Sequence, residues 1–93
     1  MTQARSGMAA VNGAQLYYET AGEGHPFIMV HAGICDSRMW DAQFEYFANR
    51  YRVIRYDMRG FGKSTMPPGP TALREDLYGM LRFLGVERAY VMG

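Results

Sequence analysis

Residues 27–40, Phe-Ile-Met-Val-His-Ala-Gly-Ile-Cys-Asp-Ser-Arg-Met-Trp, decide the fold. The first four of these residues are all apolar, which is typical of a short strand covered on both faces, as in a parallel sheet. The chain then breaks at the small residues Ala32 and Gly33, and a helical pattern begins near Trp40. A strand that breaks in this way leaves backbone N–H groups unpaired, and such groups can hold a developing negative charge. The stretch is therefore either an anion hole or a tight turn.

Two amphipathic helices and two further buried strands follow this stretch. Residues 38–50 and 73–84 are predicted to be helical, because apolar side chains recur at i, i+4, i+7, i+8 and i+11 from Trp40 to Tyr51 and from Leu73 to Leu84, the spacing of one helix face. Residues 52–56 and 87–92 have the composition of buried strands, and residues 57–70 form a loop rich in glycine and proline. Alternation of strands and helices predicts right-handed crossovers and a parallel sheet.

A hairpin is predicted upstream, at one edge of this sheet. Asn12-Gly13 is the strongest two-residue hairpin signal in the chain, and residues 8–11 and 15–20 on either side of it suit strands. We expect residues 1–7 to be a loose tail. The predicted fold class is α/β: an antiparallel edge hairpin followed by a mostly parallel sheet with flanking helices.

The composition excludes several classes of protein. A chain of 93 residues forms one domain at most, and 48% hydrophobic with 20% charged residues is an ordinary globular balance. A formal charge of +1 with scattered arginines argues against nucleic acid as a partner. Cys35 is the only cysteine, so no intrachain disulfide can form. No apolar run approaches the ~20 residues of a membrane span, and residues 1–13 lack the apolar core of a signal peptide. No membrane partner and a cytoplasmic location are the default expectations.

A nucleotide site and a metal site are both disfavoured. Gly60-Phe61-Gly62-Lys63-Ser64 resembles the end of a phosphate-binding loop, but Asp57 stands where that motif begins with glycine. A carboxylate there repels phosphate, and two prolines follow where the motif requires a helix. Two histidines and one cysteine without an H-x-x-x-H spacing predict no metal centre.

Individual polar and aromatic residues have two interpretations each. His31 could be a general base, but a histidine that bonds loop backbone and holds the turn is the favoured interpretation. Trp40 is expected to pack in the core rather than to contact substrate. Glu75 and Asp76 are adjacent on a predicted helix, and we expect both to be solvated.

Four motifs in order resemble the N-terminal half of the α/β-hydrolase fold family. They are His31-Ala32-Gly33, then Trp40, then Asp57-Met58-Arg59-Gly60-Phe61-Gly62-Lys63-Ser64, then Tyr90-Val91-Met92-Gly93. In that family one strand ends in H-G-x with a Trp at the head of the next helix. The next strand ends in D-x-R-G-x-G-x-S, and a later strand ends in V-x-G. The match covers about residues 10–93, and Gly93 corresponds to the first glycine of the nucleophile elbow, G-x-S-x-G.

The resemblance implies roles for several residues of this chain. It implies that the backbone N–H of Gly33 is an oxyanion donor, with Ile34 as the alternative because Ala32 replaces the family's usual glycine. Gly33 and Ile34 would also bind substrate, with Trp40 as a weaker candidate. The residues matching the family's structural turn are expected only to support the loops, Arg59 by tying them together: His31, Asp57, Arg59, Gly60 and Gly62.

The resemblance also implies what this stretch of chain does not contain. In such chains the nucleophile, the acid and the catalytic histidine all follow the position of Gly93. Ser37 and Ser64 are therefore not assigned as the nucleophile, since a catalytic triad needs a histidine partner. We expect residues 1–93 to be the N-terminal portion of a single hydrolase domain, inactive alone, whose partner is the remainder of that domain.

The reaction implied is hydrolysis of an ester, lactone or related small acyl substrate, without metal or other cofactor. Within the same fold the alternatives are a cofactor-free haloperoxidase, a C–C bond hydrolase, a dehalogenase or an epoxide hydrolase. The last two use Asp as nucleophile. An alternative of another class is a non-catalytic, hydrolase-like binding or signalling protein, or an inactive fragment.

Overall fold

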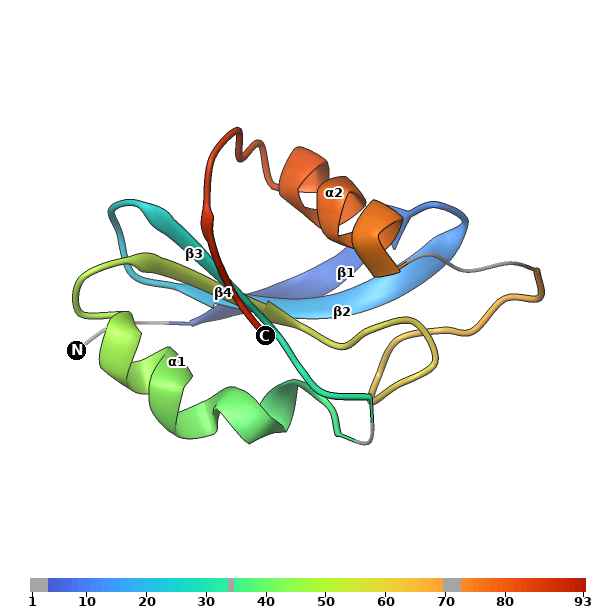
Figure 1. The fold of residues 1–93 in the computed structure, drawn as a ribbon, viewed down its shortest axis with the longest axis horizontal. Helices are drawn as coiled ribbons and strands as arrows, with labels where there is room; N and C mark the ends of the chain where they lie inside the picture. The colour runs from blue at the N-terminus through green and yellow to red at the C-terminus, as the bar shows by residue number, and fades with distance from the viewer. Residues whose placement is uncertain (1–3, 34, 70–72) are drawn as a thin grey trace.

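A computed structural model describes residues 4–33, 35–69 and 73–93. One mixed sheet lies between two helices, with α2 on one face and α1 on the other (Figure 1). The strands are β1 (Arg5–Val11), β2 (Ala14–Ala21), β3 (Pro26–Val30), β4 (Arg52–Tyr56) and β5 (Tyr90–Met92). The helices are α1 (Asp41–Phe47) and α2 (Leu73–Phe83), and a 3₁₀ turn, η1 (Ser37–Trp40), leads into α1.

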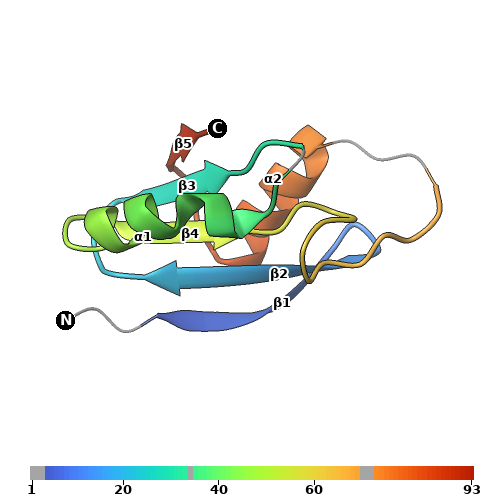
Figure 2. The same cartoon turned by 90° about the horizontal axis from the view of Figure 1, so that it is seen from below.

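The strand order is β1-β2-β4-β3-β5, visible from below in Figure 2. β1 pairs antiparallel with β2, and β2 pairs antiparallel with β4. β3 pairs parallel with both β4 and β5. The predicted fold class is therefore confirmed: an antiparallel hairpin occupies one edge, and parallel strands joined by helical crossovers form the rest.

Alternate side chains of the central strands enter two separate cores. Ile28 and Ile54 lie on the α2 face, where they pack with Leu16 and Met80. Met29 and Val53 lie on the opposite face and pack with residues of η1 and α1. Covering both faces explains why these strands are apolar at consecutive positions.

Three boundaries differ from the sequence predictions. The prediction of a loose tail is wrong from Arg5 onward, because β1 begins there and Arg5 lies opposite Thr20 of β2. The first helix is split and shorter than predicted, ending at Phe47, where Arg50 and Tyr51 both donate their N–H groups to its carbonyl oxygen. β5 begins at Tyr90 rather than at residue 87.

β5 was predicted to be buried, and in this chain it is not. Tyr90 and Val91 are each 55% exposed, although both are apolar. The strand contributes three residues to the ladder, opposite Phe27, Ile28 and Met29, and lies at the edge of the sheet. An apolar run predicts a strand suited to burial, but the number of neighbours that cover it depends on the rest of the fold.

Candidate functional site

The three motifs that lie at strand ends, those beginning at His31, Asp57 and Tyr90, meet at one edge of the sheet. Val30 lies opposite Tyr56 in the parallel register, and Met29 lies opposite Met92. The loops that follow β3 and β4, which begin with residues 31–33 and 57–64, therefore leave the sheet side by side, next to Gly93 (Figure 1). Ligands of open α/β sheets bind at the carboxyl ends of the strands, which is this edge.

His31 joins the two loops. Its Nε2 accepts the backbone N–H of Met58 at 2.8 Å, and its Nδ1 lies 2.7 Å from the carbonyl oxygen of Ala32. Because Nε2 is an acceptor, the ring is neutral and Nδ1 carries the proton that the Ala32 oxygen accepts. The ring is buried, at 3% exposure. Both nitrogens are therefore occupied in holding backbone, which is the favoured interpretation from the sequence.

Asp57 makes a second connection between the loops. One carboxylate oxygen accepts the N–H of Ser37 at 2.7 Å, and the other accepts the N–H of Lys63 at 2.9 Å. Gly62 passes close beneath this carboxylate with φ +50°, and a Cβ there would collide with it. Gly60 precedes it in the same loop and donates its N–H to the carbonyl of Thr65. The loop thus folds around a buried anion that fixes the start of η1.

Arg59 ties the second loop to α2 and to the β1–β2 hairpin. Its Nε and Nη2 donate to the two oxygens of Asp76, each at 2.9 Å, and Nη2 also donates to the Asn12 carbonyl at 3.1 Å. The two side chains are 7% and 4% exposed, so the ion pair is buried. Burial, and secondarily the charge of Asp76, raises the pKa of the neighbouring Tyr56.

The prediction of a solvated Asp76 is therefore wrong. Asp76 is 3% exposed, whereas its neighbour Glu75 lies on the surface. The sequence carried one usable signal: Asp76 stands four residues before Met80, so both lie on the buried face of α2. Its partner Arg59 comes from a loop 17 residues away, which no local pattern identifies.

The loop after β3 carries the N–H of Gly33, the predicted oxyanion donor. The Cys35 N–H closes a turn on the Ala32 carbonyl at 3.0 Å, and that carbonyl also faces His31 Nδ1. Across a trans peptide the Gly33 N–H points away from the Ala32 oxygen. It donates to none of the residues that the structure describes, and a Cβ on Gly33 would meet no atom within 4 Å. Ile34, the alternative donor, lies outside the described residues.

Trp40 lies in the core on the α1 face. It is 8% exposed and belongs to the buried cluster with Met29, Phe44 and Val53. Its indole Nε1 has no hydrogen-bond partner among the described residues. The core position agrees with the favoured interpretation of this residue.

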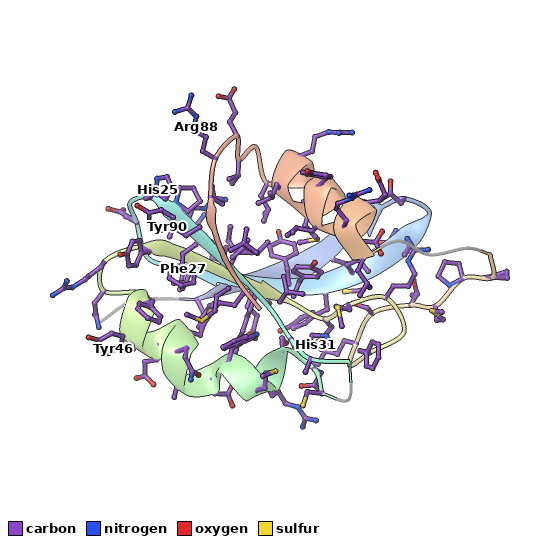
Figure 3. All side chains as sticks on the ribbon, in the orientation of Figure 1. His25, Phe27, His31, Tyr46, Arg88 and Tyr90 are labelled. Atoms are coloured by element: carbon purple, nitrogen blue, oxygen red, sulfur yellow. The ribbon has the colours of Figure 1, made fainter. Side chains whose placement is uncertain are left out.

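The serines and the second histidine do not form a catalytic pair. Ser64 Oγ donates to the Asp57 carbonyl and accepts the N–H of Tyr17 at 2.9 Å. His25 lies at the amino end of β3, with its ring 4.4 Å from that of Tyr90, at the opposite end of the strand from His31 (Figure 3). Among residues 4–33, 35–69 and 73–93, no serine and histidine side chains are hydrogen-bonded together.

A cleft of about 420 Å³ lies beside these loops, lined partly by Tyr17, Glu19, Arg55 and Lys63. Arg55 forms ion pairs with Glu19, at 2.6 Å, and with Asp41. Burial, followed by the hydrogen bond to Glu19, raises the pKa of Tyr17, and the Lys63 ammonium lies 4.5 Å from the Tyr17 ring centroid. The charged groups that line this cleft are therefore already engaged with one another.

The described residues contain no group of three or more His, Cys, Asp or Glu side chains placed to hold a metal ion. In the same part of the chain, no helix has the length and apolar character needed to cross a bilayer.

Known proteins resemble this chain in sequence and in structure. A protein from Azorhizobium caulinodans named "Putative carbamate hydrolase RutD" is 42% identical over 84 residues, which cover 86% of this chain and 31% of that protein. Epoxide hydrolase 1 from Siraitia grosvenorii is 32% identical over 90 residues, covering 90% of this chain and 29% of that protein. The enol-lactonase from Burkholderia xenovorans LB400 superposes with a TM-score of 0.82 at 36% identity, covering 91% of this chain and 35% of that one.

The chain spans about a third of the length of these relatives and corresponds to their N-terminal part. The family model described as alpha/beta hydrolase fold matches residues 25–93, well over half of the chain. That range includes all four motifs and both helical crossovers. The chain therefore belongs to the α/β-hydrolase fold family.

Proposed function

We propose that residues 1–93 supply the oxyanion-loop half of the active site of an enzyme that hydrolyses an ester, lactone or related acyl substrate. The observation that carries the proposal is the Gly33 N–H. It has no acceptor among the described residues, and it belongs to a peptide group at the carboxyl edge of the sheet whose carbonyl, that of Ala32, is held by His31 and Cys35. The enol-lactonase and the carbamate hydrolase among the similar proteins support an acyl substrate.

In this proposal the loop stabilises the negative charge that forms on the substrate during the reaction. When a nucleophile attacks a carbonyl carbon, its oxygen gains charge, and a fixed N–H donor favours that state over the substrate. A donor already held in place needs no reorganisation as the charge develops, and one such donor typically contributes about 10²–10³ in rate. Gly33 N–H is the donor from this chain, and Ile34 N–H is the alternative.

The remaining groups come from the rest of the hydrolase domain in this proposal. A second oxyanion donor, the nucleophile, its histidine and the acid all lie beyond Gly93, so the 93-residue chain alone does not turn over substrate. His31, Asp57 and Arg59 hold the loops in place and do not contact the substrate. Gly62 lets the backbone approach the Asp57 carboxylate closely. Trp40 supports the loop from the core.

Epoxide opening is a second candidate, favoured by the similarity to Epoxide hydrolase 1. The two reactions differ in the nucleophile: in this fold family an epoxide hydrolase uses Asp, whereas an esterase uses Ser. The residue two positions after Gly93 distinguishes them. A haloperoxidase or C–C bond hydrolase of the same fold would also use a serine nucleophile. A binding or signalling protein would need no nucleophile at that position.

The test uses the complete protein with a panel of short esters, lactones and epoxides and with a fluorophosphonate probe. We expect acid release from an ester or lactone and covalent labelling by the probe. Epoxide hydration without labelling would replace the proposal by the second candidate. Neither turnover nor labelling would contradict the proposal and support a non-catalytic protein.

A further inference from the structure

We propose that Met39 is a positioning residue for the Gly33 oxyanion donor, acting through a hydrogen bond from the Ala32 N–H to its thioether sulfur. The distance from Ala32 N to Met39 Sδ is 3.2 Å. This inference rests on the proposed function, because it assigns a role at the same loop. It adds a side chain eight residues after His31, on η1, to the groups that fix the donor.

The sulfur completes the restraint on Ala32. The carbonyl of this residue is held by His31 Nδ1, at 2.7 Å, and by the Cys35 N–H, at 3.0 Å. Its N–H is held by Met39. The two peptide groups that flank the Ala32 Cα are planar units, so holding one polar group on each restricts the rotations between them. The Gly33 N–H belongs to the second of these peptide groups, and its direction follows from that restraint.

The backbone of Met39 is fixed by the hydrogen bonds of η1. Its backbone N–H donates to the Asp36 carbonyl at 3.1 Å, and the Asp36 side chain caps the same turn through the Arg38 N–H. The Ser37 N–H is fixed to the Asp57 carboxylate at 2.7 Å. A continuous series of contacts therefore runs from the buried Asp57 through η1 to Met39, and from there to the loop that carries Gly33.

Core packing does not explain this side chain. Met39 is 43% exposed, in contrast to Trp40 next to it, which is 8% exposed. Met39 is absent from both buried clusters of the described residues. A thioether is a weak acceptor on a flexible stem, so the side chain can reach the Ala32 N–H and satisfy it without bringing charge close to a developing oxyanion.

The test compares three variants of the complete enzyme. Met39→Leu keeps the size and removes the acceptor, whereas Met39→Gln has similar length and restores an acceptor oxygen. Met8→Leu is the matched control, because Met8 is 44% exposed and lies on β1 at the far edge of the sheet. A neutral hydrogen bond of ordinary strength corresponds to a change of about three- to tenfold in rate.

We expect Met39→Leu to lower kcat about three- to tenfold with little change in KM, Met39→Gln to recover most of that loss, and Met8→Leu to match the wild type. Wild-type kcat in Met39→Leu would overturn the proposal, as would a loss that Met39→Gln does not recover. Gly33→Pro, measured in parallel, separates the two claims: if it retains full turnover, the assignment of Gly33 as the oxyanion donor fails as well, whereas the hydrolytic function itself fails only if the wild type turns over no ester or lactone. If it alone loses turnover, only the role of Met39 is rejected.

Discussion

The Nε2 atom of His31 accepts the backbone N–H of Met58 at 2.8 Å, so a single neutral imidazole links the loops that follow two adjacent parallel strands. Since Nδ1 of the same ring faces the Ala32 carbonyl at 2.7 Å, His31 also holds the peptide group that carries the Gly33 N–H. The strand-end histidine is therefore part of the support of the candidate site, and its two nitrogens are not available for proton transfer to a substrate.

Replacing His31 is expected to weaken both the fold and the proposed site. His31→Ala leaves the N–H of Met58 unpaired in a buried position, which costs about 1–3 kcal/mol of unfolding free energy. Urea unfolding of the complete protein measures this loss. His25→Ala is the matched control, because His25 is exposed at the other end of β3 and its carbonyl contact with the Arg52 N–H is retained. Equal losses in the two variants would contradict the linking role.

The buried ion pair between Arg59 and Asp76 gives a second prediction. Asp76→Ala leaves the guanidinium buried without its partner, and we expect a loss of about 3–5 kcal/mol in unfolding free energy. The double variant Arg59→Met with Asp76→Leu should recover much of this loss, because it removes both charges. Glu75→Ala, at the adjacent exposed position, is the control and should change stability little. A double variant no more stable than Asp76→Ala would show that the unpaired charge of Arg59 is not the cause of the lost stability.

Gly62 gives a third prediction, because a Cβ there would collide with the Asp57 carboxylate. That carboxylate must then move from the N–H groups of Ser37 and Lys63, and we expect Gly62→Ala to cost about 2–4 kcal/mol. Gly13→Ala is the control for backbone strain alone: its φ is +83°, against +50° at Gly62, and a Cβ there meets no atom within 4 Å. We expect about 1–2 kcal/mol for it. A smaller loss at Gly62 than at Gly13 would refute the collision.

The pH dependence at η1 gives a fourth prediction. Hydrogen bonds from the Arg38 side chain and backbone N–H hold the pKa of Asp36 at about 2, below its usual 3.8. Because the folded-state pKa is the lower one, the stabilisation is present above about pH 4 and is lost as the pH falls from about 4 to 2. The Arg38 side chain is 82% exposed, so solvent screens the pair and the effect on stability is small. An NMR titration should show a higher Asp36 pKa in Arg38→Gln, and an unchanged pKa would contradict the assignment.

Local sequence signals located the elements well where one pattern determines one structure. The strand at residues 52–56 was predicted with the bounds it has, because an apolar pair between polar neighbours marks a short strand. Asn12-Gly13 placed the hairpin turn, and the chain reverses there between β1 and β2. The Asp57-to-Ser64 motif marked the loop whose carboxylate and hydroxyl groups fix neighbouring backbone.

The remaining features depend on contacts between distant residues. Arg5 joins a strand because β2 extends far enough to pair with it, which the polar residues around Arg5 do not reveal. Asp76 is buried because Arg59 reaches it from another loop. The role of Met39 arises from the fold of η1 and the turn at Ala32, and nothing in the residues near Met39 identifies a thioether as an acceptor.

The most direct test of the central claim is the turnover of Gly33→Pro in the complete enzyme. Proline removes the N–H but suits the second position of a turn, so circular dichroism and the melting temperature should show a retained fold. Gly33→Ala keeps the N–H and should lose less activity. We predict that Gly33→Pro lowers kcat on the ester or lactone substrate by about 10²–10³. Unchanged turnover in a folded Gly33→Pro variant would contradict the assignment of Gly33 as the oxyanion donor.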